Sequence, residues 1–153
     1  MITITLKDGS KKSYKKNIAV IDVAKDISEG FARNVISASF NGKTVEVSTN
    51  LNENGVLELY TWDDNEGKKA FWHSSSHVLA QALEELYPGI KLTIGPAIKN
   101  GFYYDVDFND HLITDKDFDK IESKMISISR EKHDFKMRSV SKNDAIKFYK
   151  KLS

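Results

Sequence analysis

Alternating apolar and polar residues at the beginning of the chain constrain its fold more than any other feature. Residues 2–6, Ile-Thr-Ile-Thr-Leu, have the period-two pattern of a half-buried strand. Residues 7–10, Lys-Asp-Gly-Ser, predict a tight hairpin turn, and residues 11–16 predict the returning strand. The chain is therefore expected to begin with an antiparallel hairpin that buries one of its faces.

One helix and three further strands follow this hairpin. The apolar side chains of the helix have the spacing of a single helical face and are Val20, Val23, Ala24 and Ile27. Residues 35–40 alternate again, Asn41-Gly42 is a strong turn signal, and strands are expected at residues 44–47 and 56–60. This order of elements predicts an α+β fold of the β-grasp (ubiquitin-like) type, with the helix packed on one face of a small mixed sheet.

A short acidic segment separates this pattern from the rest of the chain. Residues 63–67, Asp-Asp-Asn-Glu-Gly, have no apolar periodicity and end in glycine. The chain has 153 residues, which is enough for two small domains. We therefore expect a domain boundary here, with one domain at residues 1–62 and a second at residues 63–153.

The second half is expected to mix helices with short strands. A helix from about residue 68 to residue 87 ends at Pro88-Gly89. Strands are expected at residues 90–94, 101–108 and 135–140. Thr114 with Asp117 resembles a capping box, and Ser141 is expected to cap a last helix. The apolar stripes of these two helices are predicted to be Phe118, Ile121, Met125 and Ile128, and Ala145, Phe148, Tyr149 and Leu152.

Composition excludes several classes of protein. The 23 Lys and Arg residues nearly balance the 22 Asp and Glu residues, which argues against a surface that binds nucleic acid all over. Two lysine-rich segments, residues 7–16 and 130–151, are either local phosphate-binding patches or solvated faces. The absence of cysteine excludes disulfides, thiol catalysis and thiolate zinc sites. No apolar stretch could span a membrane, and no signal peptide is present, so a soluble cytoplasmic protein is expected.

The most informative residues are a pair of histidines on the predicted helix. His73 and His77 are four residues apart, so their side chains project from one flank about one turn apart. The predicted apolar stripe of the helix consists of Phe71, Trp72, Val78, Leu79, Ala82, Leu83 and Leu86. The histidines point about 140–180° away from that stripe, and the three serines between them leave room for a ligand. A functional cleft is favoured, and a solvated surface remains the alternative.

A metal site is not expected at this pair. Metalloproteases carry a glutamate directly after the first histidine, where this chain has Ser74. A zinc ion would need a third ligand, for which His111, His133 or a carboxylate would have to serve. We therefore predict no metal in this chain, while a zinc hydrolase built on the pair stays open as a third hypothesis.

Four sequence blocks in this order and spacing resemble the editing domain of bacterial threonyl-tRNA synthetases. They are His73-Ser-Ser-Ser-His77-Val-Leu-Ala-Gln-Ala, Leu86-Tyr87-Pro88, Ile94-Gly95-Pro96-Ala97-Ile98 and Asn100-Gly101-Phe102-Tyr103-Tyr104-Asp105. The first 62 residues resemble the TGS domain that precedes this editing domain in the family. The resemblance implies a β-grasp TGS domain followed by an incomplete α+β editing domain.

The resemblance also implies an activity and a site. The parent enzyme would join threonine to its tRNA with ATP and would hydrolyse seryl-tRNA made in error. Such errors are expected, because one missing methyl group is worth only about 1–3 kcal/mol of discrimination. By resemblance, His73 and His77 line the cleft and place or activate the attacking water. Tyr103, Tyr104 and Gly95 are weaker candidates for the substrate-binding wall.

The chain lacks several parts that the family has. The family's later cysteine and histidine, its ligase core and its anticodon-binding domain do not occur in this sequence, so we expect a partial chain that is inactive alone. The resemblance places ATP with Mg²⁺ and a zinc ion in the ligase core, and no cofactor here. It implies tRNA as the partner of the full-length enzyme and a homodimer formed through other domains. A stand-alone TGS module that binds RNA or a regulatory ligand is the alternative, and an alanyl-type editing protein shares only the histidine spacing.

Overall fold

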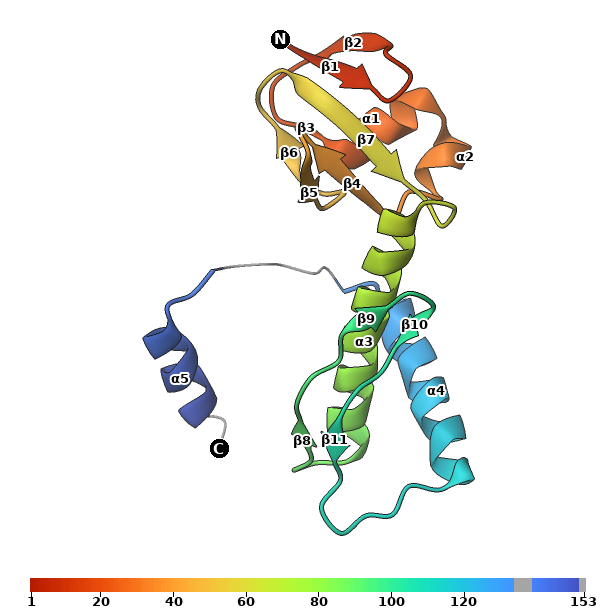
Figure 1. Ribbon diagram of the computed structural model, residues 1–153, viewed down its shortest axis with the longest axis vertical. Coiled ribbons are helices and arrows are strands. Elements are labelled where there is room, and N and C mark those ends of the chain that lie inside the picture. The colour runs from red at the N-terminus through yellow and green to blue at the C-terminus, as the bar shows by residue number, and fades with distance from the viewer. Residues whose placement is uncertain (134–138, 152–153) are drawn as a thin grey trace.

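The computed structural model describes residues 1–133 and 139–151. Figure 1 shows a β-rich unit at the N-terminal end, from which a long helix leads to a second group of helices and a narrow β-ribbon. No helix among the described residues is long and apolar enough to cross a membrane.

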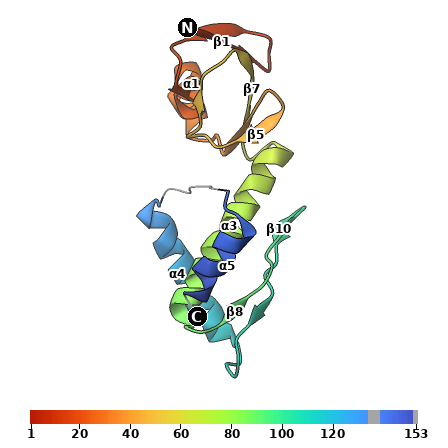
Figure 2. The ribbon, with the colours of Figure 1, turned by 90° about the vertical axis from the view of Figure 1, so that its left-hand side faces the viewer.

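Within residues 1–62 a five-stranded sheet has the order β2-β1-β7-β4-β5. Its strands are β1 (Ile2–Leu6), β2 (Lys11–Tyr14), β4 (Ser37–Phe40), β5 (Lys43–Val45) and β7 (Gly55–Tyr60). β1 and β7 are parallel, and the other neighbouring strands are antiparallel. Helix α1 (Val20–Ile27) packs beside this sheet (Figure 2). The short α2 (Glu29–Ala32) follows it. The mixed sheet with one packed helix confirms the predicted β-grasp fold.

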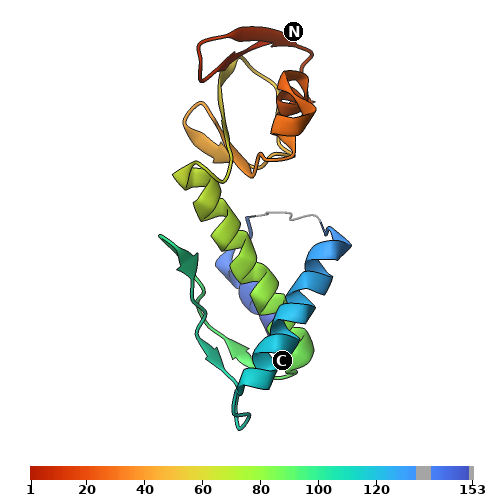
Figure 3. The ribbon, with the colours of Figure 1, turned by 90° about the vertical axis from the view of Figure 1, so that its right-hand side faces the viewer.

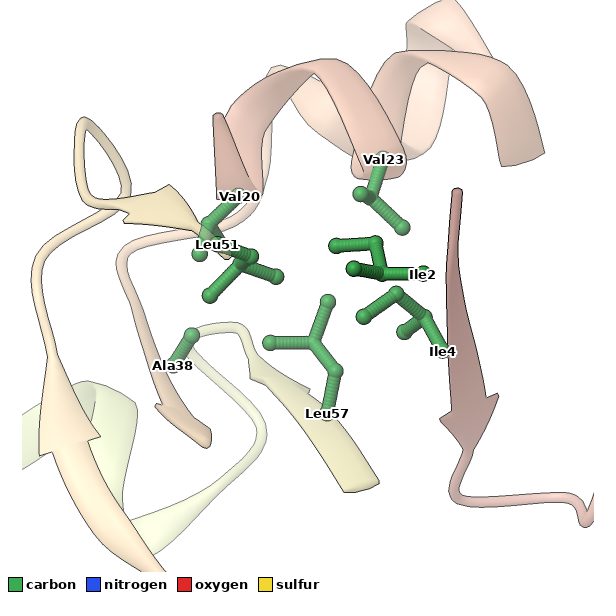
Figure 4. Close-up of a cluster of buried hydrophobic side chains, with 7 residues drawn as sticks. All are labelled: Ile2, Ile4, Val20, Val23, Ala38, Leu51 and Leu57. Atoms are coloured by element: carbon green, nitrogen blue, oxygen red, sulfur yellow. The ribbon is translucent and has the colours of Figure 1, made fainter. Parts of the chain in front are cut away.

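The core of this unit lies between α1 and the sheet (Figure 4). Its buried side chains are Ile2, Ile4, Val20, Val23, Ala38, Leu51 and Leu57. The alternation in β1 and the helical spacing in α1 predict which of their side chains are buried, except that Ile27 is 43% exposed. Leu51 reaches the core from β6 (Asn50–Leu51), which pairs with β3 (Ile18–Ala19). These two strands and α2 were not predicted, because a strand of two residues or a helix of a single turn shows no periodicity.

The predicted turn at Asn41-Gly42 is confirmed by the backbone. Asn41 has φ 51° and Gly42 has φ 76°, so both central residues of the β4–β5 hairpin are left-handed. Two positive φ values match the twist of a two-residue hairpin turn, and asparagine and glycine tolerate them best. The Asn41 side chain also accepts a hydrogen bond of 2.9 Å from the Val56 N–H, which ties the turn to β7.

The second part is built on helix α3 (Asn65–Leu86). A hairpin ribbon pairs β8 (Lys91–Leu92) with β11 (Val106–Asp107), and β9 (Ala97–Ile98) with β10 (Gly101–Phe102). Backbone hydrogen bonds between Thr93 or Ile94 and Asp105 join the two pairs into one ribbon. Figure 3 shows the ribbon along one side of α3 and helix α4 (Asp115–Glu131) against another. Helix α5 (Lys142–Lys150) follows.

Several expectations for the second part need correction. The strands predicted at residues 90–94 and 101–108 are shorter, and β9 was missed. Phe71 and Phe118 were placed in apolar stripes but are 42% and 59% exposed. Ile121 and Ile128 are buried as expected, whereas α5 buries none of its described residues. Residues 135–138 of the strand predicted at 135–140, and Leu152, lie outside the residues described, while residues 139–140 form no strand.

The acidic segment at residues 63–67 is only partly an irregular connection. Asn65 begins α3, and Gly67 is a buried residue within its first turn. Asp64 is the residue before the helix, and its carboxylate accepts a hydrogen bond of 2.8 Å from the Thr61 N–H. The expectation of an unpatterned break is therefore wrong for residues 65–67. The domain limits themselves stay a prediction.

Asp117 fixes the first turn of α4 against the end of α3. The predicted capping box is confirmed, because the Asp117 carboxylate accepts hydrogen bonds from the Thr114 N–H at 2.9 Å and from its hydroxyl at 2.7 Å. The Tyr87 hydroxyl donates to the other carboxylate oxygen at 2.9 Å. The bonds from Thr114, followed by that from Tyr87, hold the pKa of Asp117 well below its usual range.

This lowered pKa predicts how stability depends on pH. A carboxyl whose pKa is lowered on folding stabilises the native state above its unfolded pKa of about 3.9, and this contribution is lost as pH falls below that value. We expect the Asp117→Asn variant to melt at a lower temperature at pH 7 and to lose less of its melting temperature between about pH 5 and pH 2. Thermal unfolding at a series of pH values checks this, with exposed Asp119→Asn on the same helix as the control. Parallel pH curves for Asp117→Asn and the unmodified chain would contradict it.

Candidate functional site

Helix α3 places both candidate histidines on one exposed flank. Serine and histidine at its centre are only moderate helix formers, and its buried positions include Ser76, Ala82 and Leu83. His73 and His77 are both exposed and lie off this buried face. The prediction that neither histidine fills the core is therefore confirmed.

The two histidines contact each other directly. Their Nε2 atoms lie 3.1 Å apart, and the rings meet edge to face with centroids 4.7 Å apart. At this distance one nitrogen donates and the other accepts, so at least one ring is neutral. Partial burial, and then the neighbouring His73, lower the pKa of His77. A neutral imidazole at neutral pH can accept a proton from water, which is the requirement for a general base.

The serines between the histidines do not form the open surface that was expected. Ser74 is exposed, but Ser76 is only 2% exposed. The Ser76 hydroxyl donates to the His73 carbonyl oxygen at 2.7 Å, and the Ser75 hydroxyl donates to the Phe71 carbonyl oxygen at 2.9 Å. Hydroxyls that bond to the preceding helical turn need no external partner. Of the three serines, only Ser74 is therefore fully exposed to a ligand, and Ser75 is partly exposed.

The β-ribbon holds the three weaker site candidates. A Cβ atom on Gly95 would lie 2.2 Å from the ring of Tyr104, so this ring lies directly on the Gly95 backbone. Tyr103 is 50% exposed. The ribbon and α3 are packed together, and the Phe102 and Trp72 rings have centroids 6.2 Å apart. The structure thus places His73 in contact with His77 on α3, and Gly95 in contact with Tyr104 on the ribbon that packs against α3.

An aromatic cluster next to the histidines was not predicted as a unit. Trp62, Phe71 and Trp72 meet edge to face in all three pairs, with centroid distances of 5.1 to 5.5 Å. Trp72 directly precedes His73 and also contacts Phe102. The sequence contains these aromatic residues, but the approach of Trp62 to the helix depends on the path of the chain between β7 and α3.

The candidate third ligands for a metal lie in other contacts. The His111 Nε2 is 3.5 Å from the Asp117 carboxylate, and the His133 Nε2 is 2.6 Å from the Glu131 carboxylate. Among the described residues no group of three or more His, Cys, Asp or Glu side chains is arranged to hold a metal ion. The expected absence of a metal and of a cofactor stays a prediction.

Comparison with known protein families extends this description to the whole chain. A family model described as the TGS domain matches residues 2–61. These residues form a TGS domain. The match ends one residue after β7 and therefore covers the complete β-grasp sheet.

Curated relatives match beyond the TGS domain. Threonine–tRNA ligase of Flavobacterium psychrophilum is 64% identical over 98% of this chain, and that of Flavobacterium johnsoniae is 65% identical over the same share. Threonine–tRNA ligase of Clostridioides difficile is 46% identical, also over 98% of the chain. In each case the chain spans 23% of the length of the relative. The resemblance to threonyl-tRNA synthetases is confirmed along nearly the whole chain.

Proposed function

We propose that this chain is the part of a threonine–tRNA ligase that combines a TGS domain (residues 1–62) with the beginning of an editing domain (residues 63–153). Identity of 64% over 98% of the chain to a protein of that name supports the assignment. The full-length protein would join threonine to its tRNA with ATP in regions beyond this chain. Its partner is tRNA, it acts in the cytoplasm, and it dimerises through its other domains.

The editing role is carried by the contact between His73 and His77. The substrate is the ester that links serine to the terminal ribose of the tRNA. In hydrolysis a water molecule loses a proton to His77 as its oxygen attacks the ester carbonyl carbon. The bond to the ribose oxygen then breaks, and a proton returns to that oxygen as serine leaves. The Nε2 atom of His73 lies 3.1 Å from the Nε2 atom of His77. A hydrogen bond between the two rings orients the His77 ring that accepts the proton, and the proton of this bond is shared between them.

The ribbon supplies one wall of the proposed cleft. The Tyr104 ring lies directly on Gly95, and a larger residue at position 95 would displace it. The exposed Tyr103 hydroxyl can donate a hydrogen bond to the ester or to the ribose. Both tyrosines would position the substrate, and neither takes part in proton transfer.

The lowered pKa of His77 leads to a prediction for the full-length ligase. A base must be unprotonated, so hydrolysis of seryl-tRNA should fall as pH decreases through the pKa of His77. Because that pKa is below its ordinary value of about 6.5, activity should persist at pH 6.5 and decline at lower pH. Measurement of kcat/KM for deacylation from pH 5 to pH 8 checks this. A decline that begins above pH 7 would contradict a role for His77 as the base, because the pKa of His77 is lowered from its ordinary value.

Two assays on the full-length protein separate this function from the alternatives. Threonylation of tRNA and deacylation of seryl-tRNA should both occur, and deacylation should continue after dialysis against a chelator. Deacylation abolished by the chelator would favour a metal hydrolase. Binding of RNA without any deacylation would favour a TGS binding module.

A further inference from the structure

A tight contact around Gly67 joins the TGS domain to α3. A Cβ atom on Gly67 would lie 1.9 Å from the carbonyl oxygen of Thr61 and 2.7 Å from its carbonyl carbon. Both are backbone atoms, so rotation of a side chain could not relieve the overlap. Glycine is needed at this position because the first turn of α3 lies directly against the residue that follows β7.

Hydrogen bonds fasten the same connection. The Asp64 carboxylate accepts from the Thr61 N–H at 2.8 Å and from the Thr61 hydroxyl at 3.3 Å. The Asp64 N–H donates to the Thr61 carbonyl oxygen at 3.2 Å, and the Lys68 N–H donates to the Asp64 carbonyl oxygen at 3.0 Å. The end of the strand and the start of the helix are therefore bonded through shared residues, with no free segment between them.

Side-chain packing supports the connection from outside. The Trp62 ring lies edge to face against Phe71, at 5.1 Å, and against Trp72, at 5.5 Å. Helix α3 also packs against β4 of the TGS sheet. Contacts at the strand end, along the first two turns of the helix and on the sheet together oppose rotation about the connection.

We propose that these contacts make the TGS domain and α3 one rigid body, and that Gly67 is a positioning residue for His73 and His77. The catalytic consequence rests on the proposed function, whereas the rigid connection does not. Gly67 precedes His73 by six positions, which is about 9 Å along the helix axis. Any tilt of α3 at Gly67 would move the histidines relative to the TGS domain. The domain therefore serves as the rigid support on which the hydrolytic site is held.

Distance measurement between two spin labels tests the rigid connection. The chain has no cysteine, so Lys43→Cys on β5 and Glu84→Cys on α3, both at exposed positions, are unique labelling sites. The unmodified connection should produce one narrow distance distribution. Gly67→Ala should broaden or shift it, and Asp64→Ala should broaden it by removing the bonds to Thr61. A broad distribution without either substitution, or an unchanged one in Gly67→Ala, would overturn the proposal.

Gly30→Ala is a matched control for Gly67→Ala. Gly30 also lies in a helix, but a Cβ atom there meets only the Ser28 hydroxyl oxygen, at an ordinary 3.6 Å. Helix propensity favours alanine over glycine at both positions, so only the contact with Thr61 should make their effects differ. The Gly30→Ala distance distribution should match that of the unmodified chain, and a change equal to that of Gly67→Ala would overturn the role of the contact.

Deacylation by the full-length ligase tests the positioning role. Gly67→Ala should lower kcat for seryl-tRNA hydrolysis by on the order of tenfold to a hundredfold, with KM and threonylation unchanged. An altered label distance with unchanged kcat would overturn the role of Gly67 in positioning. His77→Ala distinguishes this failure from failure of the proposed function, because unaffected deacylation in that variant would reject the hydrolytic site itself.

Discussion

His77→Ala in the full-length ligase is expected to slow deacylation of seryl-tRNA by on the order of 10²–10⁴-fold, the usual loss when a proton-transfer group is removed. The Nε2 atoms of His77 and His73 lie 3.1 Å apart, so at least one of the two rings is neutral. A neutral ring can accept the proton of the attacking water. His73→Ala should slow the same step, since it removes the partner that orients this ring. Threonylation should be unchanged, because under the proposed function its chemistry belongs to another region of the full-length protein.

The control for this prediction is Glu84→Ala. Glu84 lies on α3 about two turns after His77 and is exposed, so its removal tests the effect of any change on that flank. All three variants should melt close to the unmodified protein, because exposed substitutions usually change the free energy of unfolding by about 0.5 kcal/mol or less. Unchanged deacylation in both histidine variants would indicate that His73 and His77 are solvated surface residues. Loss of both deacylation and threonylation together with a lowered melting temperature would indicate that the two histidines stabilise the fold.

Leu57→Ala is expected to destabilise the TGS domain by about 2–5 kcal/mol, which is the usual effect of shortening a buried leucine. Leu57 is fully buried in β7, the central strand of the sheet, and contributes to the core with Ile4 and Val23. The loss is large compared with the roughly 5–15 kcal/mol that stabilises a typical domain. Hydrogen exchange of the β1 and β7 amides measures it, because exchange reports the free energy of opening this sheet.

Val56→Ala is the matched control on the same strand. Val56 precedes Leu57, points to the opposite face of the sheet and is 47% exposed. Its truncation should change the opening free energy by less than about 1 kcal/mol. Equal effects of the two substitutions would contradict the placement of the core between the sheet and α1.

Local patterns were sufficient to predict most of the TGS domain. Ile2 and Ile4 are buried as the period-two pattern requires, and Asn41-Gly42 adopts the left-handed backbone of a hairpin turn. These features depend on neighbouring residues in the chain, which the sequence displays directly. The two-residue strand that carries Leu51 could not be predicted, because only its pairing with Ile18 makes it a strand.

Glycines show most clearly where local reasoning fails. Gly67 was interpreted as part of an irregular linker, and Gly95 as a candidate for the substrate-binding wall. In the structure each glycine is required because another group occupies the space of a Cβ atom, the Thr61 carbonyl for Gly67 and the Tyr104 ring for Gly95. A sequence contains the glycine but does not state which distant atom approaches it.

The sequence by itself determined that His73 and His77 share one flank of a helix, because four residues at about 100° each return a side chain nearly to the same direction. It also determined, through their distance from the apolar stripe, that this flank is exposed. Only the tertiary structure decided that Ser76 is buried, that Trp62 packs on Trp72 and that the ribbon lies along α3. Each of these depends on how α3 packs against the rest of the chain, and such packing leaves no periodic pattern in the sequence.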